Sequence, residues 1–134
     1  MSLAPLLNAP FAIQLHAFAA MGAFVLGIVQ FASPKGTLPH RTVGWIWAAL
    51  MLIIAISSFW ITGDSIRLAG PFSPIHLLSV LVLFMLPAAL WFAHRHKVSA
   101  HSKTMAGLFT GALIIAGLFT FVPGRIMHAV AFGP

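Results

Sequence analysis

Each of the four long apolar stretches of this sequence carries one histidine near the end at which the stretch begins: His16, His40, His76 and His101. An imidazole in or beside hydrocarbon is costly unless something binds it, and neutral imidazole is a common metal ligand. Four histidines in this pattern therefore predict ligands rather than isolated polar side chains.

Several other kinds of chemistry are excluded by the residues that the sequence lacks. It contains no cysteine and no tyrosine, and its single acidic residue is Asp64. A thiolate nucleophile, a carboxylate-bridged pair of metal ions and a hydrolase with paired carboxylates all need side chains that are absent. The histidines are therefore the best candidates for a site.

The composition is that of an integral membrane protein. Hydrophobic residues make up 60% of the 134 positions, charged residues make up 6%, and the mean hydropathy is +1.04. A water-soluble domain of this size needs more polar side chains to cover its surface. The net charge of +6 would suggest nucleic acid as the partner of a soluble chain, but basic loops of a membrane protein set its topology. We expect the lipid bilayer as the surrounding partner, and no nucleic acid.

Four transmembrane helices are predicted, over about residues 10–32, 41–62, 73–93 and 102–122. Each segment has close to the ~20 apolar residues that cross the hydrocarbon core. Connections this short force consecutive helices to be antiparallel neighbours. The predicted fold class is an all-α membrane protein, an up-down-up-down four-helix bundle that forms one domain over residues 1–134.

Basic residues are distributed unequally between the two sides of this bundle. The loops after the first and third spans carry five of them: Lys35, Arg41, Arg95, Lys97 and Lys103. The loop after the second span and the carboxyl-terminal tail carry Arg67 and Arg125. By the positive-inside rule, the first group faces the cytoplasm. We therefore predict a multi-pass protein of the bacterial inner (plasma) membrane, with both termini in the periplasm.

The four histidines fall at two depths. His16 and His76 are sixteen and seventeen residues from the cytoplasmic ends of their spans, or ~24–26 Å at 1.5 Å per residue. His40 and His101 lie at the cytoplasmic ends of the second and fourth spans. Because the first and third helices of such a bundle are diagonal partners, as are the second and fourth, two pairs are predicted. These are His16 with His76, and His40 with His101.

Small residues near the histidines would leave room for a planar macrocycle between two imidazoles. Those at helical spacing are Ala20, Ala23, Gly27, Gly44, Gly107 and Gly111. Small residues at this spacing, Gly107-x-x-x-Gly111 above all, also mediate close packing of membrane helices. Both interpretations stay open.

The histidine placement over residues 10 to 128 resembles that of the transmembrane di-haem cytochromes b of the ascorbate-reducible type. In that family four core helices each contribute one haem-ligating histidine, first with third and second with fourth. The resemblance implies one or two b haems, with iron ligands His16, His76, His40 and His101. The chain departs from that family in the uneven histidine spacings of 24, 36 and 25 residues, and in having four spans without flanking helices.

The sequence also resembles small bacterial four-span membrane proteins in which one helix begins with His-Arg-x-x-Gly and a later one with His-x-x-x-Met. The matching segments are His40-Arg41-Thr42-Val43-Gly44 and His101-Ser102-Lys103-Thr104-Met105. This match is closer in sequence and implies no activity.

Haem propionates need basic partners. We expect Arg41 and Lys103 beside a cytoplasmic haem, and Arg67 or Arg125 beside an outer one. His128, near the depth of the outer pair, is a further candidate ligand or substrate contact.

The predicted function is a haem b-binding membrane electron-transfer protein of the quinol or small-reductant oxidoreductase type. The alternative is a cofactor-free accessory or assembly subunit of a larger membrane complex, which the small size and the glycine and alanine faces favour. Partners left open are a quinone, other subunits of a membrane complex and a second copy of the chain. A histidine box for a metal over residues 94–101 is disfavoured, because neighbouring cations repel a divalent ion and no carboxylate offsets its charge.

Overall fold

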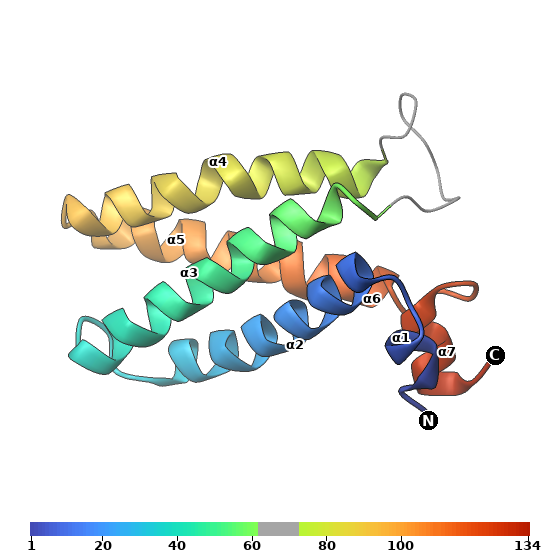
Figure 1. Cartoon of the computed structure of the whole chain (residues 1–134). Coiled ribbons are helices and arrows are strands. Elements are labelled where there is room, and N and C mark those ends of the chain that lie inside the picture. Colours follow the sequence, from blue (N-terminus) through green and yellow to red (C-terminus); the bar gives the residue numbers. More distant parts are fainter. Residues whose placement is uncertain (62–72) are drawn as a thin grey trace.

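The computed structural model describes residues 1–61 and 73–134, and every regular element in these ranges is a helix (Figure 1). The first three long helices are α2 (Phe11–Ala32), α3 (Leu38–Ser58) and α4 (Pro74–His94). The fourth long segment consists of α5 (Val98–Leu108), the π-helix η1 (Phe109–Ile115) and α6 (Ala116–Phe119). The short helices are α1 (Ala4–Leu7) and α7 (Ile126–Phe132).

Within the described residues, four helical segments are long and apolar enough to cross a membrane. α2 packs on α3, α3 on α4 and α4 on α5, and η1 returns to α2 and closes the bundle. The α2–α3 and α4–α5 loops lie together at one end, and both termini lie at the other (Figure 1). We call the first the basic end, after its loops at residues 33–37 and 95–97, and the second the terminal end. The predicted all-α, up-down-up-down bundle is confirmed.

Capping moves the start of the second span. Thr37 Oγ1 accepts a hydrogen bond from the backbone N–H of His40 (3.3 Å), which satisfies one free donor of the first turn. α3 therefore begins at Leu38, three residues before the predicted start, and ends at Ser58. The predicted end, Thr62, lies outside the described residues. The fourth span also begins about one turn earlier than predicted, because α5 continues directly from the α4–α5 turn.

The interior of the bundle is closed by a few large side chains that pack on small ones. Trp47 on α3 donates its indole N–H to the carbonyl oxygen of Ala23 on α2 (2.9 Å). A Cβ at Gly27 on α2 would overlap the ring of Phe109, the first residue of η1. The π-helix is not predicted by the sequence pattern, and it places this ring against α2.

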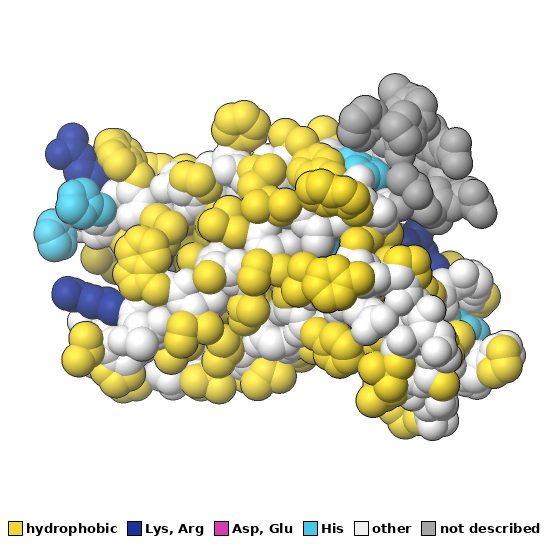
Figure 2. Space-filling model, in the orientation of Figure 1, with side chains coloured by type: hydrophobic (Ala, Val, Ile, Leu, Met, Phe, Trp, Pro, Cys, Tyr) yellow, Lys and Arg dark blue, Asp and Glu magenta, His cyan; other side chains and the backbone are white. Residues whose placement is uncertain are grey.

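The outward faces of the bundle are apolar along its length (Figure 2). Large side chains such as Phe18, Val25, Leu81, Phe84 and Leu118 are exposed there. A contiguous apolar surface of this extent is typical of a protein surrounded by lipid. Figure 2 shows the most prominent group of Lys, Arg and His side chains at the basic end, on the left, and others toward the terminal end.

Candidate cofactor-ligand histidines

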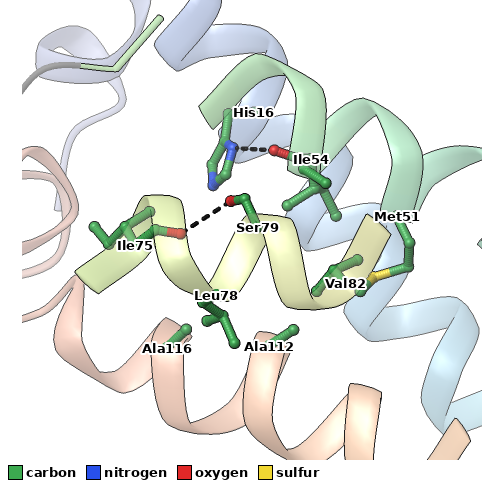
Figure 3. Close-up of a pocket in the computed structure, with 10 residues that line it drawn as sticks. His16, Met51, Ile54, Ile75, Leu78, Ser79, Val82, Ala112 and Ala116 are labelled. Carbon is green, nitrogen blue, oxygen red and sulfur yellow. Dashed lines mark hydrogen bonds between the residues drawn. The ribbon is translucent and has the colours of Figure 1, made fainter. Parts of the chain in front are cut away.

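His16 lies on α2 at the terminal end, and α3 holds its ring. Its Nδ1 is 2.9 Å from the carbonyl oxygen of Ile54 and 3.2 Å from Ser57 Oγ. Because a carbonyl oxygen only accepts, Nδ1 of the neutral ring carries the proton and Nε2 holds the lone pair. Figure 3 shows the second ring nitrogen turned away from Ile54 toward a cavity. Such anchoring of one nitrogen by a carbonyl is typical of histidines that ligate through the other.

His76, its predicted partner, plays a capping role at the start of α4. The imidazole is buried, and its Nδ1 accepts a hydrogen bond from the backbone N–H of Ser73 (3.1 Å). Ser73 Oγ lies at the same distance from Nδ1, and the ring of Phe59 packs against the imidazole with centroids 5.8 Å apart. The neutral ring therefore carries its proton on Nε2, the opposite tautomer from that of His16.

The cavity beside His16 is lined from all four spans (Figure 3). Its walls include Met51 on α3, Ser79 on α4 and Ala112 on η1, and its volume is about 50 Å³. That volume holds a few water molecules, whereas sites for small organic ligands have ~300–1,000 Å³. A porphyrin does not fit at this level without separation of the helices.

The glycines expected to make room divide into two kinds. Phe109 fills the space beside Gly27, and Gln30 lies 3.1 Å from a Cβ built at Gly44. These two glycines serve helix packing. Among the described residues, no side chain lies within 4 Å of a Cβ at Gly107 or Gly111, so this face of the fourth span is open to them.

Sequence reasoning missed a group of buried serines at the terminal end. Ser57, Ser58, Ser73 and Ser79 are each less than a tenth exposed. The hydroxyls of Ser58 and Ser79 are 2.5 Å apart and join α3 to α4. The available signal was the presence of serines within apolar spans at the same depth as His16 and His76, since buried hydroxyls need partners.

The other predicted pair, His40 and His101, lies at the basic end, with His40 in the first turn of α3 and His101 near the start of α5. His101 Nδ1 is 2.8 Å from the carbonyl oxygen of Ala89 on α4, so this ring repeats the arrangement of His16 and its Nε2 holds the lone pair. His40, in the first turn of α3, lies within electrostatic range of His101. Nδ1 of His40 is buried and has no hydrogen-bond partner among the described residues. A buried nitrogen in that state is destabilising unless a ligand satisfies it.

The basic residues predicted beside the propionates are found at both ends. Arg41 adjoins His40 and Lys103 follows His101 by two residues, so both belong to the basic end and both are exposed. Arg125 lies at the terminal end, where it lines an open cavity of about 260 Å³ between α1 and α7 together with His128. His128 therefore does not line the cavity of His16. Arg67 lies outside the described residues, as does Asp64.

The histidines of residues 94–101 do not form a metal cluster. His94 ends α4, His96 lies in the α4–α5 turn, and the His101 ring is hydrogen-bonded to α4. In the parts of the chain that the structure describes, no three histidine or acidic side chains gather into a group that could hold a metal ion.

Comparison with known proteins supports the membrane assignment. Residues 13–127 match the model of a family described as predicted membrane protein (DUF2306). No curated protein and no solved structure matches the chain. The family match reaches into all four spans and includes His16, His40, His76 and His101.

Proposed function

Because this chain belongs to the DUF2306 family of predicted membrane proteins, whose description states no activity, we propose a function from its histidines: the chain binds haem b and transfers electrons within or across the membrane. The observation that carries the proposal is the pair at the basic end. His101 has an anchored Nδ1 and a lone pair on Nε2, and His40 at the same end has a buried Nδ1 with no hydrogen-bond partner among the described residues. Two imidazoles on diagonal helices are the donor set of a six-coordinate b haem.

The chain would supply the surroundings of the haem, and the bound haem would supply a one-electron couple at its iron. The Ala89 carbonyl fixes the tautomer and the orientation of His101, as an outer hydrogen-bond partner does for ligating histidines. Arg41 and Lys103 are the basic partners within reach of propionates at this end.

The terminal end supports a second haem less well. His16 has the lone pair of a ligand, but Nε2 of His76 carries a proton and the cavity between the spans is too small. Ligation there would need His76 to release Ser73 and α2 to move away from α4. We therefore propose a haem at the basic end, and the His16–His76 haem stays an expectation from the sequence.

Two observations favour a second candidate function, that of a cofactor-free accessory or assembly subunit. The spans already pack closely at the terminal end, and the face at Gly107 and Gly111 is open to another helix. Other subunits or a second copy of the chain would then be the partner. A quinone as electron donor remains part of the first proposal only.

One measurement separates the two candidates. The protein is purified from haem-replete cells, and its optical spectrum is recorded before and after dithionite. Sharp reduced-minus-oxidised bands of a six-coordinate b haem, at a ratio of one or two haems per chain, are expected. A folded but colourless preparation would overturn the haem proposal and favour the accessory subunit.

A further inference from the structure

The α4–α5 turn is built so that two cations converge on one indole ring. The guanidinium carbon of Arg95 lies 5.4 Å from the ring centroid of Trp91, and Nζ of Lys97 lies 5.4 Å from the same centroid. Each contact is a cation–π interaction, for which ~6 Å is the useful limit. Two like charges at the surface are therefore held by the same aromatic ring.

The backbone of the turn enforces this convergence. His96 has a φ of 56°, in the left-handed region, and its N–H donates to the carbonyl of Ala93. The N–H of Lys97 donates to the carbonyl of Phe92 (2.9 Å). This pair of bonds is the Schellman arrangement that ends helices, and it turns the chain back on the last turn of α4. Lys97 is thereby returned to the face of α4 that carries Trp91.

No anion within the described residues satisfies the two cations. The side-chain nitrogens of Arg95 and Lys97 make no hydrogen bond to these residues. The only acidic residue of the sequence, Asp64, lies outside them, between α3 and α4. Lys35 at the same end differs, because its Nζ donates to the carbonyls of Gln30, Phe31 and Ser33 and so caps α2. A topology signal needs positive charge in the loop, but it does not need two charges on one ring.

We propose that Trp91, Arg95 and Lys97 bind the phosphodiester headgroup of an anionic phospholipid. The indole is half exposed one turn before the end of a membrane-spanning helix, the depth at which tryptophan meets headgroups. Exposed Val98 on the next helix continues the apolar surface, along which acyl chains can lie. A lipid thus meets both the cations and the apolar face, whereas a free phosphate meets the cations alone.

The test is native mass spectrometry of the full-length protein released from detergent containing phosphatidylglycerol or phosphatidylcholine. Retention of phosphatidylglycerol is expected, and R95Q/K97Q should weaken it by about fivefold for each charge removed. W91L should also weaken it, because the cations lose the ring that positions them. The matched control R41Q/K103Q removes two charges from the same end and should weaken retention much less.

Three outcomes would overturn the proposal. Equal losses in R95Q/K97Q and R41Q/K103Q would mean a diffuse positive surface rather than a site. Equal retention of phosphatidylcholine, whose own choline cation offsets its phosphodiester charge, would mean that the net negative charge of the lipid is not recognised. Complete displacement by millimolar inorganic phosphate would identify a free phosphate as the ligand. Circular dichroism of each variant checks that the helices are intact.

Discussion

At the scale of single residues, the four candidate histidines differ in how their ring nitrogens are held. His16 and His101 each donate from Nδ1 to a carbonyl of the neighbouring helix, and His76 accepts at Nδ1 from the start of its own helix. Only a neutral ring that donates from Nδ1 has a lone pair on Nε2 that can bind iron. These roles predict which substitutions remove a haem.

For the basic-end pair, we expect His40→Ala and His101→Ala each to remove the same haem. The double variant should lose no more than either single variant, because a site that needs both ligands is broken by the first substitution. His94→Ala is the matched control, since this histidine is exposed at the same end. The haem-to-protein ratio measures the result, and loss with His94→Ala but not with His101→Ala would contradict the assignment.

For the terminal-end pair, His16→Ala and His76→Ala should likewise remove one shared haem, if the second site forms. Redox titration of the two variants should then show the same component missing. Independent losses, one haem for each histidine, would contradict the diagonal pairing. His76→Ala should in addition destabilise the start of α4 by about 1 kcal/mol, because Ser73 loses its capping partner.

At the scale of the elements, the fit of η1 against α2 depends on one glycine. We expect Gly27→Ala to lower the free energy of unfolding by about 1–3 kcal/mol, because the new methyl group overlaps the Phe109 ring. Gly107→Ala is the control, because its position is open. Unfolding in mixed micelles measures both. An equal loss of stability in the two variants would show that the Phe109 ring moves aside at little energetic cost.

The α4–α5 turn offers a second prediction at this scale. His96→Gly should raise the free energy of unfolding by up to about 1 kcal/mol, because glycine adopts the left-handed conformation without the strain of a side chain. His96→Val should lower it, since a β-branched residue is least suited to a φ of 56°. The same unfolding assay checks both, and equal stabilities would argue against the left-handed backbone at this position.

At the scale of the whole molecule, positive charge is concentrated at one end of an apolar bundle. Five Lys and Arg residues lie in or beside the two loops of the basic end. The other two, Arg67 and Arg125, follow the second and fourth spans in the sequence. The orientation in the membrane stays a prediction from this asymmetry. It places His40 and His101 on the cytoplasmic side, and His16 and His76 toward the periplasm.

A reporter that is active only in the cytoplasm tests that orientation. Fusions after Ser33 or Val98 should be active, and a fusion at Pro134 should be inactive, because both loops of the basic end are predicted to face the cytoplasm. A reporter active only in the periplasm provides the converse control. The reverse pattern would overturn the orientation while leaving the bundle and its histidine pairs unchanged.

Sequence alone was sufficient for the membrane class, the four spans, the antiparallel order and the two levels of histidines. These properties follow from local hydropathy, span length and loop length, which depend on the order of residues along the chain and not on how the helices pack. The second and fourth helices begin up to about one turn before the approximate spans expected from the sequence, because capping by Thr37 and the α4–α5 turn extend them. The haem ligands and the orientation remain predictions.

Only the tertiary structure decided which histidine nitrogens are available and where space remains. The carbonyls of Ile54 and Ala89 belong to the backbone of neighbouring helices, so no residue type in the sequence marks them as partners. The π-helix turned Phe109 into the space that Gly27 was expected to leave for a cofactor. Hydrogen-bond direction and packing volume depend on the register between helices, and that register is set by the assembled bundle rather than by any one span.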